Sequence, residues 1–190
     1  DSITTGDYNV GVGDNALTSV TTGNYNTATG YKALFYNTTA SNNTATGYQS
    51  MYWNTTGAYN SALGEGSLQS NTSGNHNTAV GYRALYESTT ANSNTAVGKG
   101  SLSANTTGAE NTGLGRSSLE KNTTGASNVA VGAYAMLDNT TGSNSTALGR
   151  EALANNTTGA NNTASGYQAL YYNTTGYSNT GSGPYALYAN

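Results

Sequence analysis

The stretch that decides the fold is Asn26-Thr27-Ala28-Thr29-Gly30-Tyr31-Lys32-Ala33-Leu34. It returns as Asn43-Thr44-Ala45-Thr46-Gly47-Tyr48-Gln49-Ser50-Met51, and again as Asn77-Thr78-Ala79-Val80-Gly81-Tyr82-Arg83-Ala84-Leu85. Its glycine recurs every 17 residues in eleven copies, with no insertion or deletion. These register glycines are Gly13, Gly30, Gly47, Gly64, Gly81, Gly98, Gly115, Gly132, Gly149, Gly166 and Gly183. A fixed short period predicts a solenoid, in which each repeat packs only on its neighbours.

The composition fits a stack of coils better than a globular core. Hydrophobic residues make up 35% and charged residues 8% of the 190 residues, and both values lie below those of globular domains. Low hydrophobicity alone would favour disorder, but disorder normally comes with high charge and irregular spacing. We therefore expect one continuous solenoid over residues 1–190, with no separate globular domain.

Each repeat carries one aliphatic residue four positions after its register glycine, and this column is predicted to be the core. Its members are Leu17, Leu34, Met51, Leu68, Leu85, Leu102, Leu119, Met136, Leu153, Leu170 and Leu187. The position just before the glycine holds Val or Leu in seven copies and is predicted to face the core from the opposite wall: Val12, Leu63, Val80, Val97, Leu114, Val131 and Leu148. Two further columns hold only small residues, as a thin coil demands.

The pattern predicts about two short strands in each coil. One is Asn-Thr-Ala-Val before the glycine, and the other runs from Ala-Leu through Thr-Thr, where β-branched Thr suits a strand. Identical residues would stack about 4.8 Å apart, so that eleven coils form a rod of roughly 50 Å. Stacked Asn and Thr columns could form hydrogen bonds along the axis. The predicted fold class is all-β: a single parallel β-solenoid, or β-roll, of eleven 17-residue coils.

Charge and hydropathy exclude several classes of partner. The charged residues cluster one or two positions after the register glycine, as at Lys32, Glu65 and Arg83, which indicates a solvated corner. The net charge of −3 offers no basic surface for nucleic acid. No apolar run is long enough for membrane insertion. No signal-peptide pattern stands at Asp1, so a secreted form is expected to be a mature or trimmed one.

The motif Asn-Thr-Ala-Val-Gly-x-x-Ala resembles the head repeat of trimeric autotransporter adhesins of the YadA type. The copies that carry the resemblance are Asn94-Thr95-Ala96-Val97-Gly98-Lys99-Gly100-Ser101 and Asn128-Val129-Ala130-Val131-Gly132-Ala133-Tyr134-Ala135. It covers about half of each repeat over the whole chain, and related repeats occur in bacterial and phage fibre proteins. The resemblance implies a parallel β-roll, a homotrimer and a cell-surface or extracellular location.

The sequence lacks the residues that catalysis would need. His76 is the only histidine and stands in a variable column, so a tolerated surface residue is the better interpretation. The nine carboxylates never pair within a repeat as a general acid and base would. The Asp that calcium-binding solenoids carry in each turn is replaced by Asn and Thr. We expect no enzyme, and no cofactor or metal.

Three repeated features are functional candidates. An Asn-x-Thr/Ser sequon recurs once in most coils and is a formal glycan acceptor, although an internal Asn ladder explains it better: Asn37, Asn54, Asn71, Asn105, Asn122, Asn139, Asn156 and Asn173. Val20 and Ser88 break this column. Tyr31, Tyr48, Tyr82 and Tyr167 follow the register glycine and could bind glycans, or could lie flat on the coil. Ice binding would need two outward Thr per strand, whereas adjacent Thr residues point to opposite faces.

The two ends of the chain share one register, because Ile3-Thr4-Thr5-Gly6 matches Val20-Thr21-Thr22-Gly23 and Asn190 matches Asn173. A second chain could therefore continue the coil, and head-to-tail contacts that do not close form a filament. The leading hypothesis is an extracellular structural protein whose subunits stack end to end in a surface appendage, sheath or biofilm matrix. The alternative is an adhesin or fibre head that binds surface glycans, possibly as a homotrimer.

Overall fold

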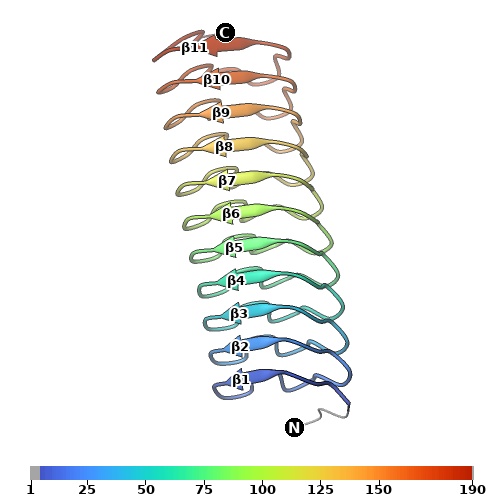
Figure 1. Ribbon diagram of the computed structural model, residues 1–190. Helices are drawn as coiled ribbons and strands as arrows, with labels where there is room; N and C mark the ends of the chain where they lie inside the picture. The colour runs from blue at the N-terminus through green and yellow to red at the C-terminus, as the bar shows by residue number, and fades with distance from the viewer. Residues whose placement is uncertain (1–4, 190) are drawn as a thin grey trace.

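The computed structural model describes residues 5–189, which wind into a regular stack of coils from β1 to β11 (Figure 1). Each coil adds one strand to a single parallel sheet whose strand order follows the sequence. The strands are β1 Val10–Val12, β2 Thr27–Thr29, β3 Thr44–Thr46, β4 Ser61–Leu63, β5 Thr78–Val80, β6 Thr95–Val97, β7 Thr112–Leu114, β8 Val129–Val131, β9 Thr146–Leu148, β10 Thr163–Ser165 and β11 Thr180–Ser182. The predicted all-β solenoid of 17-residue coils is confirmed; the predicted matches at Ile3, Thr4 and Asn190 lie outside the described residues.

Each coil contains one strand and not the two that the sequence suggests. The segment after the register glycine forms two successive turns, in which Ala33 N donates to Gly30 O and Asn37 N donates to Leu34 O, each at 3.3 Å. The following Thr-Thr segment bonds to the next coil, as Thr38 N does to Thr55 O, but it is bent. The second strand is absent because Leu34, at φ 50°, is left-handed and interrupts any extended run.

The inward residue of each strand is the middle one. Ala96 of β6 is buried, while Thr95 and Val97 point to the outer face, because successive side chains of a strand alternate between its two sides. The prediction that the Val/Leu column faces the core is therefore wrong. Val12 is 56% exposed and Leu63 is 53% exposed. Register is kept from strand to strand, as Thr78 pairs with Thr95 and Val80 with Val97.

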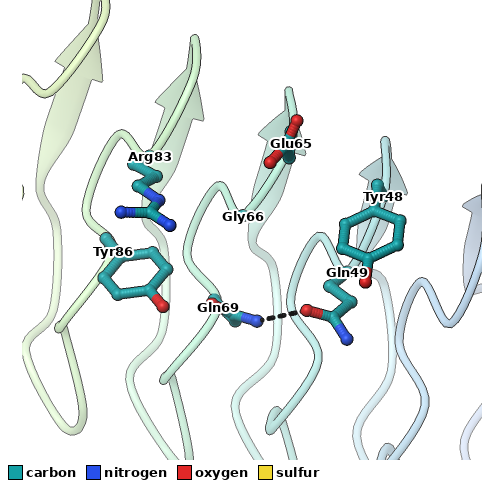
Figure 2. Close-up of a pocket in the computed structure, with 7 residues that line it drawn as sticks. All are labelled: Tyr48, Gln49, Glu65, Gly66, Gln69, Arg83 and Tyr86. Atoms are coloured by element: carbon teal, nitrogen blue, oxygen red, sulfur yellow. Dashed lines mark hydrogen bonds between the residues drawn. The ribbon is translucent and has the colours of Figure 1, made fainter.

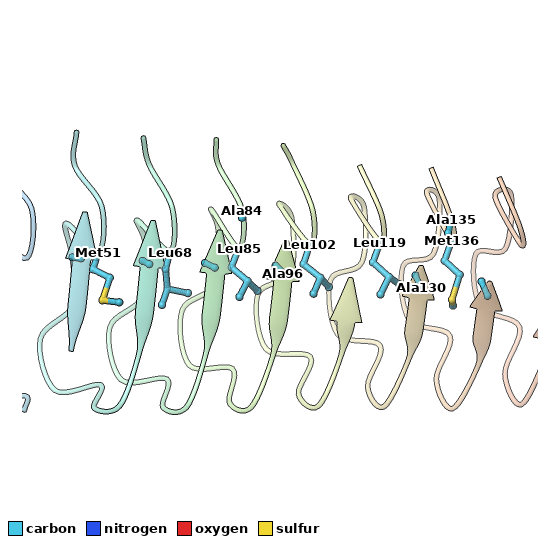
Figure 3. Packing of buried hydrophobic residues seen from close by; sticks show 14 of the residues in the cluster. Met51, Leu68, Ala84, Leu85, Ala96, Leu102, Leu119, Ala130, Ala135 and Met136 are labelled. Atoms are coloured by element: carbon cyan, nitrogen blue, oxygen red, sulfur yellow. The ribbon is translucent and has the colours of Figure 1, made fainter. Parts of the chain in front are cut away.

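The core is the predicted aliphatic column, stacked behind the sheet (Figure 3). The members from Leu34 to Leu170 are fully buried, and Leu17 is nearly so, whereas Leu187 in the last coil is 47% exposed. Small residues from two other columns face this core. At Gly113, an added Cβ would lie 2.5 Å from Ser101 Oγ, so the space between these two columns is already filled. This tight spacing explains why only Ala, Gly or Ser occurs there.

The register glycines close each strand where the chain turns. Their φ values lie between 112° and 138°, a region that side chains rarely adopt. Space excludes a side chain as well, because a Cβ at Gly98 would lie 2.5 Å from the carbonyl oxygen of Gly115 in the next coil. The invariant glycine therefore reflects both backbone conformation and axial packing.

Candidate functional site

The asparagines of the sequon column lie inside the coil and form a ladder along the axis. Asn54 Nδ2 donates to Asn37 Oδ1 of the preceding coil at 3.0 Å and to Gly57 O at 2.9 Å. The whole column from Asn37 to Asn173 is buried. A glycan acceptor nitrogen in this position is enclosed and already bonded, so the folded coil favours the internal ladder over a modified Asn.

A second Asn ladder, four residues before the register glycine, runs beside the first. Asn43 N donates to Asn26 Oδ1 at 3.0 Å, which links consecutive coils. Both ladders meet at one carbonyl per coil: Ala40 O accepts from Asn26 Nδ2 at 2.8 Å and from Asn37 Nδ2 at 3.1 Å. The interior thus contains two amide columns as well as the aliphatic column. Because buried amides are stable only when hydrogen-bonded, these columns act as structural groups.

The two breaks in the first ladder differ in their consequences. Val20 is fully buried and extends the aliphatic cluster. Ser88 is also buried, but its hydroxyl has no hydrogen-bond partner among the described residues. Asn105, one coil further on, bonds Gly108 O at 2.9 Å. Ser88 is therefore a gap in the polar ladder.

The residues that could support catalysis are dispersed. His76 stacks on Tyr59 of the preceding coil, with ring centroids 5.1 Å apart and planes 5° apart. Within residues 5–189, no group of three or more His, Asp or Glu side chains could hold a metal ion. The ion pairs are surface contacts, Lys121 with Asp138 and Arg150 with Glu151. The absence of enzymatic activity stays a prediction.

Aromatic residues form stacks on the outside of the coils. Tyr31 stacks on Tyr48 with centroids 5.4 Å apart, and Tyr36 stacks on Trp53 at 4.4 Å. Lys32 lies over the Tyr31 ring, and hydrogen bonding to that residue raises the pKa of the Lys32 ammonium. Stacking between neighbouring coils turns the ring faces toward each other. The rings therefore present mainly their edges to solvent, except where a stack ends.

Tyr48, at the end of its stack with Tyr31, lines a small cavity of about 80 Å³, which we call the Gly66 notch (Figure 2). Three consecutive coils line it: Tyr48 and Gln49 from the first, Glu65, Gly66 and Gln69 from the second, and Arg83 and Tyr86 from the third. The notch exists because Gly66 occupies a column that holds Gln49 one coil before and Arg83 one coil after. Gln69 Nε2 donates to Gln49 Oε1 at 2.9 Å across its floor.

The sequence places Glu65, Arg83 and Tyr48 just after the register glycines, at a solvated corner, but does not predict the notch. The sequence does contain a pattern that could have indicated the notch. Gly66 and Gly100 are the two glycines in a column that otherwise carries larger side chains. Only the stacking of coils shows which side chains close around each gap. At Gly100 the nearest neighbours of an added Cβ belong to Ser117 and Glu120, whereas at Gly66 they belong to Tyr86 and Arg83.

The outer face of the sheet is a second surface feature. The outward positions of β1 to β11 carry only Thr, Ser, Val and Leu, without a charged or aromatic side chain. Leu114 and Leu148 are 46% and 42% exposed on it. Outward Thr pairs, the pattern expected for ice binding, occur in β2 and β3, but Val, Leu or Ser takes the second position in the later strands. The described part of the chain contains no helix that could span a membrane.

In comparisons with known proteins, no family model, no curated protein and no solved structure matches this chain. The resemblance to the head repeats of trimeric autotransporter adhesins therefore stays a prediction.

Proposed function

We propose that the protein is a non-enzymatic structural rod whose coils stack end to end into an extracellular or cell-surface filament. The observation that carries this proposal is the axial hydrogen-bond ladder. Each coil offers its neighbour the same backbone and Asn groups, as when Thr78 N bonds Asn94 O and Asn94 N bonds Asn77 Oδ1. Contacts of this kind do not form a closed ring, so further coils can be added along the axis without limit.

The repeated strand pairing supports the same proposal. Each strand from β2 to β10 pairs with one strand on either side, and a strand edge is a template for another strand. A further coil, whether it belongs to the same polypeptide or to a second copy, would find the same groups in the same register. With a net charge of −3 spread over 190 residues, charge repulsion between stacked copies is small.

Electron microscopy of the purified native protein tests this proposal. We expect fibres far longer than the roughly 50 Å of one chain, with an axial repeat near 4.8 Å. Discrete rods containing one to three chains, under conditions that include high protein concentration, would overturn it.

The uncharged outer face of the sheet favours a second candidate, an adhesin or fibre head whose rods pack side by side, as a homotrimer. Exposed aliphatic residues along one face mark an interaction surface, and a face that repeats with each coil suits another copy with the same axial spacing. Replacing Leu114 by Lys would place a charge at the centre of this face while leaving the coil intact. If side-by-side packing holds, sedimentation analysis of Leu114→Lys gives monomers where the unmodified chain gives trimers.

A further inference from the structure

We propose that the Gly66 notch binds one neutral hexopyranose unit of a glycan. This inference supplies a ligand for the adhesin, the second candidate above, and it does not depend on how the chains assemble. Its starting point is a missing side chain in a column that carries larger side chains in most coils. At Gly66 the neighbouring coils partly cover the space, with the Tyr86 ring closing one side, and leave a cavity of about 80 Å³. The edge of one pyranose ring can enter a cavity of that size.

The polar groups around the gap provide both hydrogen-bond donors and acceptors. The carboxylate of Glu65 only accepts and the guanidinium of Arg83 only donates, and each is a planar fork that can bind two adjacent hydroxyl groups. Within the described residues neither side chain forms an ion pair, and both are exposed. A ligand rich in hydroxyl groups matches this pairing better than an anion or a cation, because the two charges balance.

The glutamines add a fixed amide floor. The Gln69–Gln49 hydrogen bond of 2.9 Å orients both amides, which uses one N–H of Gln69 and one acceptor site of Gln49. The amino group of Gln49 and the carbonyl of Gln69 keep further hydrogen-bonding capacity for a ligand. Two amides held in place before binding lower the entropic cost of recognition.

Aromatic rings flank the notch on both sides. Tyr48 and Tyr86 stand one coil to each side of Gly66 (Figure 2). The Tyr86 ring lies close over Gly66, where an added Cβ would be 3.3 Å from a ring carbon. Arg83 lies 4.9 Å from the Tyr86 ring centroid and so helps to fix the ring. The apolar C–H face of a pyranose packs on an aromatic ring, while its hydroxyl groups meet polar side chains.

Saturation-transfer difference NMR on the full chain tests the proposal, with methyl β-D-glucopyranoside and methyl β-D-galactopyranoside as probes. We expect transfer to the ring protons of at least one glycoside. The variant Gly66→Gln should abolish it, because Gln fills the notch. Gln fits the backbone here, since it occupies the same column at Gln49 and Gln168 with φ of 51° and 53°. Tyr86→Leu should also lose the signal, because it removes the aromatic wall.

The matched control is Gly100→Gln, which makes the same change in the same column two coils away, where φ is +69° and an added Cβ would meet Ser117 and Glu120 in place of an aromatic ring. This variant should keep the transfer seen with the unmodified chain. Absence of transfer to both glycosides, or equal transfer in Gly66→Gln, would overturn the proposal. Circular dichroism verifies that each variant is folded. Sedimentation analysis of the same samples reports assembly, so a failed sugar site is distinguishable from a failed filament or trimer.

Discussion

At the scale of single residues, the least expected feature is a leucine or methionine in the left-handed region in every coil. The core column has φ between 49° and 54°. This conformation costs roughly 1–2 kcal/mol for a residue with a Cβ. Full burial of a Leu or Met side chain contributes roughly 1.5–3 kcal/mol. Burial therefore outweighs the strain, and the same residue both turns the chain and fills the core.

The gap at Ser88 makes a prediction at this scale. Replacing Ser88 by Asn should restore the amide ladder between Asn71 and Asn105, as the neighbouring coils show with Asn71 Nδ2 donating to Asn54 Oδ1 at 2.6 Å. Each restored hydrogen bond is worth about 1 kcal/mol. We expect Ser88→Asn to raise the unfolding temperature in calorimetry or circular dichroism.

The control for that variant is Ser88→Ala, which removes the unpaired hydroxyl without completing the ladder. It should be neutral or slightly stabilising. If the Asn variant is no more stable than the Ala variant, the ladder contributes nothing at this position and our interpretation of the Asn column is wrong.

At the scale of the strand, the three-residue element separates an inner from an outer face with a single buried side chain. The sequence does not show which residue of Thr-Ala-Val faces the interior, because Ala and Val are both apolar. Only Ala is small. Packing decides which side chain is buried. Ala96 fits the narrow space behind the sheet, whereas a valine at the inward position would collide with the neighbouring side chains. The larger residue is therefore the one turned outward.

A pair of substitutions in β6 tests this assignment. Ala96→Val should destabilise the chain by about 1–3 kcal/mol, because it overpacks the interior. Val97→Thr should change stability by less than about 0.5 kcal/mol, because the side chain is on the outer face, where Thr29 and Thr46 occupy the same column. Urea denaturation measures both. The reverse order of effects would place Val97 in the core.

At the scale of the whole molecule, each coil contacts only the coils next to it. Strand contacts join consecutive strands alone, from β1·β2 to β10·β11. Stability should therefore be a sum over coils and their interfaces, as in other solenoids.

Deletions provide the corresponding prediction. Removing residues 99–115, one full period of 17, should leave every column in register and preserve cooperative unfolding. Removing only residues 99–106 shifts every later column and should split the rod into two less stable pieces. Thermal unfolding followed by circular dichroism compares them, and equal stability of the two deletions would contradict the column model.

The sequence by itself determines the period, the parallel stacking, the aliphatic core column and the need for glycine at each register position, because all of these depend on repetition along one axis. It also lists the residues of the candidate notch without showing that they meet. The tertiary structure alone decides the number of strands per coil, which strand face is buried, and which side chains close around Gly66. The physical reason is that these features depend on distances across a coil and between coils. A left-handed leucine, a narrow interior and a missing side chain set those distances, and local propensity predicts none of the three.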